Sequence, residues 1–240
     1  MTGRALSVLL YGESGSGKST YATTGPAPRL IIDLESSARF LVHLNKRTWD
    51  PHTEEPPVYD GTWDTAVVNA HTFEDVQKAY DWLKSGRHPF KTVVVDSFSE
   101  LQVRAQEAIN GRNSMKMQMW GELLSKMGFM GRDLRDLTTH KTNPLEAVVI
   151  ITTMQIRDGK AQPYLQGQVA SQIPYWYDIT GYYYVSQDTD PTTGETVENR
   201  NLLISNNPNY VAKTRVPGLP PILKNPNIEQ QLEDIFGPRQ

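Results

Sequence analysis

The sequence lacks cysteine, has few histidines and contains no long apolar run, and each absence excludes a class of function. Without cysteine, the chain of 240 residues has no disulfide, no thiolate metal site and no thiol nucleophile. Its 5 histidines are scattered and do not have the spacing of metal ligands. No apolar segment approaches the roughly 20 residues that a membrane-spanning helix needs. Any catalysis must therefore use carboxylates, hydroxyls, amides and cations.

An excess of positive charge is also missing. The chain carries 24 Lys and Arg against 27 Asp and Glu, a net charge of -3. A protein that coats nucleic acid over its whole surface would be basic, so any DNA contacts require clustered cations. The hydrophobic share of 38% and the charged share of 21% are typical of a globular protein. We expect one domain over residues 1–240, no membrane association and a cytoplasmic location, because the first residues do not read as a signal peptide.

Short apolar segments alternate with helical patterns over the first two thirds of the chain. Strands are expected at 5–11, 29–33, 65–70, 91–96 and 146–153, and helices at 73–85, at 98–109 and up to about residue 137. Later strands at 182–186, 200–205 and 210–214, with a turn-rich segment at 188–194, are typical of antiparallel hairpins. The order predicts an α/β fold, with a mostly parallel central sheet flanked by helices and a C-terminal antiparallel hairpin extension. We interpret the acidic, Pro-rich residues 48–64 as a surface insertion and residues 217–240 as a tail.

A glycine-rich segment lies between the first strand and a candidate helix, where a phosphate-binding loop must lie. It reads Gly12-Glu13-Ser14-Gly15-Ser16-Gly17-Lys18-Ser19, followed by Thr20, and fits the pattern G-x-x-x-x-G-K-[ST]. In such a loop the backbone N–H groups surround the phosphates at a helix N-terminus. Lys18 would reach the terminal phosphates and the Ser19 hydroxyl would hold magnesium. The loop therefore predicts binding of a nucleoside triphosphate, ATP with Mg²⁺.

Carboxylates at two further strand ends complete the pattern of a triphosphate hydrolase. The β-branched strand from Lys91 ends at Asp96, which would contact the magnesium ion directly or through water. Asp33 and Glu35 follow the second strand, at the sheet edge where ligands of α/β proteins bind. Either could orient or deprotonate the attacking water, and the residues alone leave the choice between them open.

Four segments resemble, in order, the motifs of the RecA superfamily of recombinases and DNA-dependent ATPases. They are residues 12–20, Ile32-Asp33-Leu34-Glu35, Val93-Val94-Val95-Asp96-Ser97 and Met154-Gln155-Ile156-Arg157. A fifth, Val211-Ala212-Lys213-Thr214-Arg215, lies where bacterial RecA has a short basic strand. The chain is most similar to the compact phage-encoded RecA-like annealing proteins, the Sak-four family, which implies the cytoplasm of a host cell.

The resemblance implies a role for each matching position. Glu35 becomes the water-activating carboxylate, Asp96 the magnesium-site carboxylate and Gln155 the amide that senses the terminal phosphate. Lys213 and Arg215 would reach the phosphates of a neighbouring subunit, so the active site would lie at the interface of a homo-oligomer, in a filament or a ring.

The same resemblance implies single-stranded DNA as the main partner. The loop from Arg112 to Lys116 and the loop from Arg157 to about Gln166, with Lys160, would face the DNA, and Tyr164 offers a stacking surface. A single-strand DNA-binding protein is the further partner implied. Because elements found around the core of bacterial RecA have no counterpart here, annealing is expected rather than full strand exchange.

Three other functions are compatible with the phosphate loop. A nucleotide-switched assembly protein would use ATP without touching DNA, and the acidic balance of the chain suits that alternative. A small-molecule kinase would need an arginine-rich lid, and no segment has clustered arginines. A hexameric helicase motor normally carries a further domain, for which this chain has no room.

Overall fold

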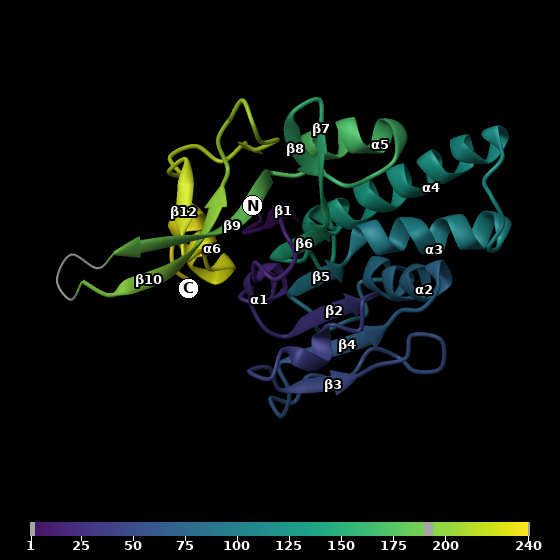
Figure 1. The fold of residues 1–240 in the computed structure, drawn as a ribbon. Coiled ribbons are helices and arrows are strands. Elements are labelled where there is room, and N and C mark those ends of the chain that lie inside the picture. Colours follow the sequence, from purple (N-terminus) through teal and green to yellow (C-terminus); the bar gives the residue numbers. More distant parts are fainter. Residues whose placement is uncertain (1–2, 190–193, 240) are drawn as a thin grey trace.

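The computed structural model describes residues 3–189 and 194–239, and its core is one large sheet (Figure 1). Within the described residues this sheet has ten strands in the order β12-β10-β9-β1-β6-β5-β2-β4-β3, with β11 paired to β9. The strands are β1 (Leu6–Tyr11), β2 (Arg29–Asp33), β3 (Lys46–Thr48), β4 (Thr65–Asn69), β5 (Thr92–Asp96), β6 (Ala147–Thr152), β9 (Ile179–Thr189), β10 (Thr196–Leu203), β11 (Lys213–Thr214) and β12 (Ile222–Lys224). β7 (Met154–Arg157) and β8 (Lys160–Pro163) form a separate hairpin.

The pairing confirms the predicted fold class. All neighbours from β9 to β3 pair in parallel, whereas β10, β11 and β12 are antiparallel additions beyond β9. The predicted turn at 188–194 lies partly outside the described residues.

Helices cover both faces of the sheet because the buried strands are apolar on both sides. In Figure 1, α2 (Phe73–Lys84), α3 (Phe98–Asn110), α4 (Met117–Asp136) and α5 (Gly167–Gln172) cover one face. α1 (Lys18–Ala22) and α6 (Ile228–Phe236) cover the other, and the one-turn helices η1 (Ala38–Phe40), η2 (Leu137–Thr139) and η3 (Ile173–Tyr175) lie in connections. Along β1 the side chains alternate between these cores: Leu9 packs toward α2–α5, and Val8 and Leu10 toward α1 and α6.

Local sequence signals fix several helix ends. Thr72 caps α2 with a capping box to Asp75, as its position before the apolar pattern predicts. Ser97 caps α3 by accepting from the backbone N–H of Glu100. The predicted helix ends near residues 85, 109 and 137 agree with α2, α3 and α4 to within one residue.

Residues 48–64 form the irregular excursion that the sequence predicts, but they are more than a surface insertion. Trp49 and Trp63 are 2% and 4% exposed and belong to the core under α2. The indole of Trp82 on α2 donates to the carbonyl oxygen of Pro51 at 3.2 Å. The segment is largely exposed, as a surface insertion is expected to be, and these two tryptophans anchor it to the core.

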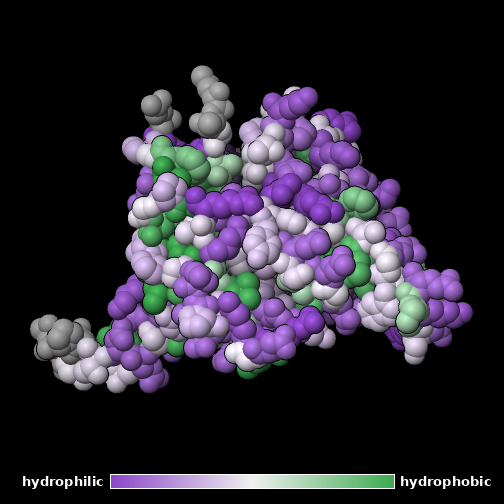
Figure 2. Space-filling view, turned by 90° about the horizontal axis from the view of Figure 1, so that it is seen from above, coloured by the Kyte–Doolittle hydropathy of each residue, from purple (hydrophilic) through white to green (hydrophobic). Residues whose placement is uncertain are grey.

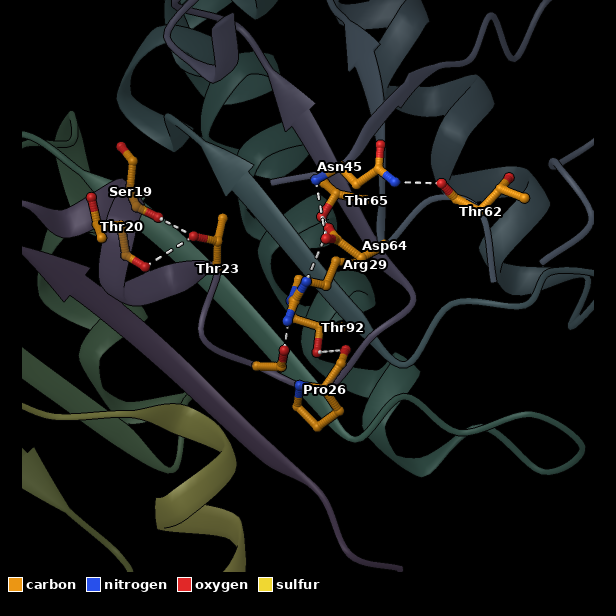
Figure 3. A network of polar contacts seen from close by, with 11 residues as sticks. Ser19, Thr20, Thr23, Pro26, Arg29, Asn45, Thr62, Asp64, Thr65 and Thr92 are labelled. Atoms are coloured by element: carbon orange, nitrogen blue, oxygen red, sulfur yellow. Dashed lines mark hydrogen bonds and ion pairs between the residues drawn. The ribbon is translucent and has the colours of Figure 1, made fainter. Parts of the chain in front are cut away.

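The five-residue α1 is held from two directions. Figure 3 shows the first, in which the Thr23 hydroxyl donates to the carbonyl oxygens of Ser19 at 3.1 Å and Thr20 at 2.9 Å. In the same figure, the guanidinium of Arg29 at the start of β2 donates to Asp64 Oδ1 at 3.2 Å. On its other side α1 meets α6, where the Tyr21 hydroxyl donates to Gln231 at 2.8 Å. The Thr23 bonds close the C-terminal end of α1 locally, and the bond to α6 is the tertiary contact on which the position of so short a helix depends.

The tail 217–240 contributes β12 to the sheet and α6 to the core. No described helix is long and apolar enough to cross a membrane. Figure 2, a view from above, shows hydrophilic residues spread over that face, with apolar residues in small separate groups.

Candidate active site

The phosphate loop joins the carboxyl end of β1 to α1, and its surroundings require two of its glycines. A Cβ atom on Gly12 would lie 2.2 Å from the carbonyl oxygen of Tyr183 on β9. Gly17 has a left-handed backbone with φ of 97°, and a Cβ there would lie 2.8 Å from Nε of Arg200. A side chain at either position would displace the loop, whose backbone N–H groups are the phosphate ligands of this motif.

Lys18 lies at the mouth of the loop. Its ammonium donates to the carbonyl oxygens of Gly12 at 3.0 Å and Glu13 at 2.6 Å. Burial lowers the pKa of Lys18, and the charges of Asp96, Glu35 and Glu13 partly oppose that shift. Lys18 lines a cavity of about 640 Å³, which is within the size range of small-molecule binding sites.

The two predicted magnesium ligands are in direct contact, although they are far apart in the sequence. Ser19 Oγ donates to Asp96 Oδ2 at 2.6 Å, and Ser37 Oγ donates to the same oxygen at 3.1 Å. Burial raises the pKa of Asp96, the bond from Ser19 opposes this, and the charge of Glu35 adds to it. A hydroxyl beside a buried carboxylate fits Mg²⁺, which takes oxygen ligands and completes its shell with phosphates and water. The described residues contain no group of three or more His, Asp or Glu side chains that could hold a metal ion without such help.

The structure separates the two carboxylates that follow β2. Asp33 is 3% exposed, and its oxygens accept from the backbone N–H groups of Ser37 at 3.0 Å and Ala38 at 2.9 Å. It therefore holds the connection into η1. Glu35 is exposed, lines the cavity with Lys18 and Asp96, and accepts a hydrogen bond from the Ser97 hydroxyl. Of the two, only Glu35 is placed where it can reach water beside a bound triphosphate.

Beyond the end of β6, Gln155 does not line the ATP cavity, although the resemblance implied that it senses the terminal phosphate. Gln155 is the second residue of β7, and its amide donates to the carbonyl oxygen of Pro163 on β8 at 3.2 Å. The residues before it, Thr152, Thr153 and Met154, line the cavity instead. The Thr152 hydroxyl is fully buried and has no hydrogen-bond partner in the part of the chain that the structure describes. A polar atom left unpaired at a cavity wall suits a ligand or a water molecule there, and the sequence shows it only as a threonine ending an apolar strand.

Lys213 and Arg215 do not belong to the cavity of their own chain. Lys213 pairs with Thr180, whereas Tyr11, which adjoins the loop, pairs with Tyr182 further along β9. The Lys213 ammonium donates to the carbonyl oxygen of Tyr177, and the Arg215 guanidinium donates to that of Tyr175. Burial, followed by the charge of Arg215, lowers the pKa of Lys213 to about 8.

The residues predicted to face DNA lie in two separate places. Arg112 and Lys116 are exposed on the connection between α3 and α4, at the far end of that helix pair in Figure 1. Arg157 and Lys160 flank the turn of the β7–β8 hairpin, which corrects the expectation of an irregular loop there. Tyr164, just after β8, is 43% exposed. A single chain therefore does not unite the two groups into one surface.

Sequence reasoning missed Arg200 on β10. Its side chain packs against Gly17 and pairs with Glu198 at 3.2 Å. The strand order β10-β9-β1 brings this cation beside the phosphate loop. No local motif surrounds it, so only the sheet topology could have revealed it.

The fold and the loop define a P-loop ATPase domain. Residues 4–216 match the AAA domain family, and since this is most of the chain, the protein belongs to that family. Membership indicates nucleotide hydrolysis, for which domains of this kind generally use ATP and Mg²⁺. No curated protein matches the chain.

Proposed function

We propose that this ATPase is a RecA-like protein that binds single-stranded DNA and anneals complementary strands as a homo-oligomer, as the phage Sak-four proteins do. The observation that carries the proposal is the continuity between the ATP cavity and the β7–β8 hairpin. Met154 lines the cavity and is also the first residue of β7, whose far end carries Arg157 next to the turn. A change of nucleotide at the cavity therefore acts directly on an exposed basic hairpin.

In this proposal hydrolysis uses Mg²⁺ held by Ser19 and Asp96, water activated by Glu35, and cations from a neighbouring subunit. The hydrogen bonds that Lys213 and Arg215 make to backbone carbonyls leave donors on both groups for phosphate oxygens. Because the net charge is -3, one copy binds DNA weakly, and useful affinity comes from many copies along the strand. A single-strand DNA-binding protein would be a further partner, and the protein would act in the cytoplasm.

The test compares ATP hydrolysis by the purified protein with and without single-stranded DNA, with Lys18→Ala as the inactive control. Single-stranded DNA should stimulate turnover, duplex DNA should not, and a labelled oligonucleotide should be retained with a non-hydrolysable ATP analogue. Two complementary labelled strands should then anneal faster with the protein than without it. Absence of both stimulation and retention would overturn the proposal and favour the nucleotide-switched assembly protein.

A further inference from the structure

A second cavity, of about 490 Å³, lies against the phosphate loop. We call it the tyrosine pocket, because its lining includes Tyr182, Tyr183, Tyr184 and Tyr210, together with residues 13–16 of the loop and Asn207. Successive residues of β9 point to opposite faces of the sheet. Tyr183 stacks on Tyr21 of α1, so Tyr182 and Tyr184 belong to the face away from α1. The tyrosine pocket and the ATP cavity therefore share only the loop between them.

The three rings of the tyrosine pocket form an ordered stack. Tyr182 is the central ring, 4.2 Å from Tyr210 at an interplanar angle of 21° and 5.5 Å from Tyr184 at 12°. Tyr182 is only 9% exposed, whereas the two outer rings are half-buried. A stack that ends in partly exposed, nearly parallel rings is a platform onto which another flat ring can be added.

The charges around the tyrosine pocket select the kind of ligand. Its described walls include the carboxylate of Glu13 and no lysine or arginine. Phosphate is therefore disfavoured inside it, whereas an uncharged planar group is not. Asn207 is half-buried, and its amide oxygen accepts from the backbone N–H of Asn209 at 2.9 Å. Its amide NH₂ can donate to the hydrogen-bonding edge of a nucleobase.

Cations lie on the other side of the same chain segment. Residues 206 and 211–213 line a neighbouring cavity of about 300 Å³. Its cationic lining residues are Lys213, from this segment, and Lys160. The segment from Asn206 to Lys213 thus places Asn207 and Tyr210 at one cavity and Lys213 at the other, where Lys160 of β8 also lies. A nucleotide chain needs such a division, with uncharged bases on one side and charged phosphates on the other.

We propose that the tyrosine pocket takes up one unpaired base of single-stranded DNA, stacked on the Tyr184–Tyr182–Tyr210 rings, with a flanking phosphate at Lys160. The inference rests on the proposed function and adds a contact that its predicted DNA loops lack.

The tyrosine pocket also connects the DNA to the site of hydrolysis. Tyr11 directly precedes Gly12 of the phosphate loop, and its ring lies 5.5 Å from that of Tyr182. The Tyr11 hydroxyl donates to the carbonyl oxygen of Ala161 on β8 at 3.1 Å. A base added to the stack is thus connected, through Tyr182 and Tyr11, to the phosphate loop and to the β7–β8 hairpin.

The experiment measures the affinity of an oligonucleotide that contains 2-aminopurine, with a non-hydrolysable ATP analogue, by fluorescence and by filter retention. Tyr184→Ala should weaken binding about 5- to 150-fold, because stacking of one base contributes about 1–3 kcal/mol. Tyr184→Phe keeps the ring and should stay within about 2-fold of the wild type. Tyr59→Ala removes a tyrosine that is 43% exposed and packs on Trp63 outside this pocket, so it is the matched control. Quenching of 2-aminopurine should be lost in Tyr184→Ala alone.

Asn207→Asp provides a second variant that leaves the aromatic stack intact, because an aspartate of the same shape can still accept from the backbone N–H of Asn209. It places another carboxylate beside Glu13 and should also weaken DNA binding. Equal DNA affinity for Tyr184→Ala, Asn207→Asp and Tyr59→Ala would overturn the inference while leaving the proposed function intact. An increase in the KM for ATP with unchanged DNA affinity would also overturn it, since the tyrosine pocket would then serve the nucleotide. A wild-type protein that binds no single-stranded DNA would remove both proposals.

Discussion

The phosphate-loop region and the cationic edge at Lys213 and Arg215 differ in how far one chain completes them. In the first, Ser19 and Asp96 are 77 positions apart in the sequence and yet share a 2.6 Å hydrogen bond. Glu35 and Lys18 line the same cavity. In the second, both cations donate to backbone carbonyls of their own chain and neither lines that cavity. One chain thus brings together the side chains of the phosphate-loop region around a single cavity. Lys213 and Arg215 contact no part of that cavity in the same chain.

Among the substitutions in the phosphate-loop region, Lys18→Ala should have the largest effect on ATP hydrolysis. Loss of the ammonium at the loop mouth should reduce ATP hydrolysis by about 10³-fold or more, because preorganised charge at the phosphates is a large share of catalysis. Phosphate release measures the rate, and circular dichroism checks the fold. Lys141→Ala, at an exposed position between η2 and β6, is the matched control and should keep its activity. Substantial turnover by Lys18→Ala would mean that the loop is not the catalytic site.

Glu35→Gln and Asp33→Asn distinguish the carboxylate that activates water from the one that holds the backbone in the phosphate-loop region. Glu35→Gln should keep nucleotide binding and lose about 10²-fold in turnover, the usual contribution of a general base. Asp33→Asn should instead lower the free energy of unfolding by about 1–3 kcal/mol, because one acceptor of the Ser37 and Ala38 N–H groups is weakened. Fluorescent-nucleotide titration, steady-state kinetics and urea unfolding give the three readouts. The reverse pattern would assign the water-activating role to Asp33.

Mixing two variants with reduced activity tests whether the cationic edge serves a neighbour. Lys213→Ala alone should lose about tenfold in turnover, the loss expected for about 1.4 kcal/mol of transition-state stabilisation. Added to Lys18→Ala, it should restore part of the activity, because mixed interfaces combine an intact loop with an intact Lys213. Hydrolysis is measured across mixing ratios at constant total protein. A strictly additive mixture would place Lys213 outside the reaction.

Asp96→Asn should produce the smallest effect, on stability. Because burial raises the folded-state pKa of Asp96, its contribution to stability is full below its unfolded pKa and is lost as pH rises through the folded value. In its ionised form, Asp96 therefore destabilises the metal-free protein. Asp96→Asn should raise the melting temperature at pH 7, by about 2–4 °C for each kcal/mol gained, and should abolish further stabilisation by Mg²⁺ with ATP. At pH 4 the difference from wild type should shrink. A lower melting temperature at pH 7 would contradict this account.

Local patterns made much of the phosphate-loop region predictable. The glycines and Lys18 form one continuous motif, and Asp96 ends a β-branched strand, so the parallel sheet brings both to one edge. The sequence could not decide between Asp33 and Glu35, since the decision depends on which backbone N–H groups a carboxylate meets. Arg200 and Thr152 were missed because strand order and an unpaired hydroxyl appear only in three dimensions.

The cationic edge was less predictable for a different reason. A short basic segment such as residues 213–215 reads the same whether it faces solvent, DNA or a second subunit. In residues 48–64 the acidic and proline residues indicated a loop, but Trp49 and Trp63 decided where that loop packs. The β7–β8 hairpin appeared as an irregular loop because its 4-residue strands are too short for a clear alternating pattern.

The contact between α1 and α6 sets a practical boundary for this protein. The family match ends at residue 216, but Thr24, just after α1, accepts a bond from the backbone N–H of Ile228 at 2.8 Å, and Tyr21 bonds Gln231. A version trimmed to the matched residues would leave the helix behind the phosphate loop without its main support. Affinity tags, fusions and deletions at the C-terminal end therefore act on nucleotide binding, although that end is the part of the sequence furthest from the loop.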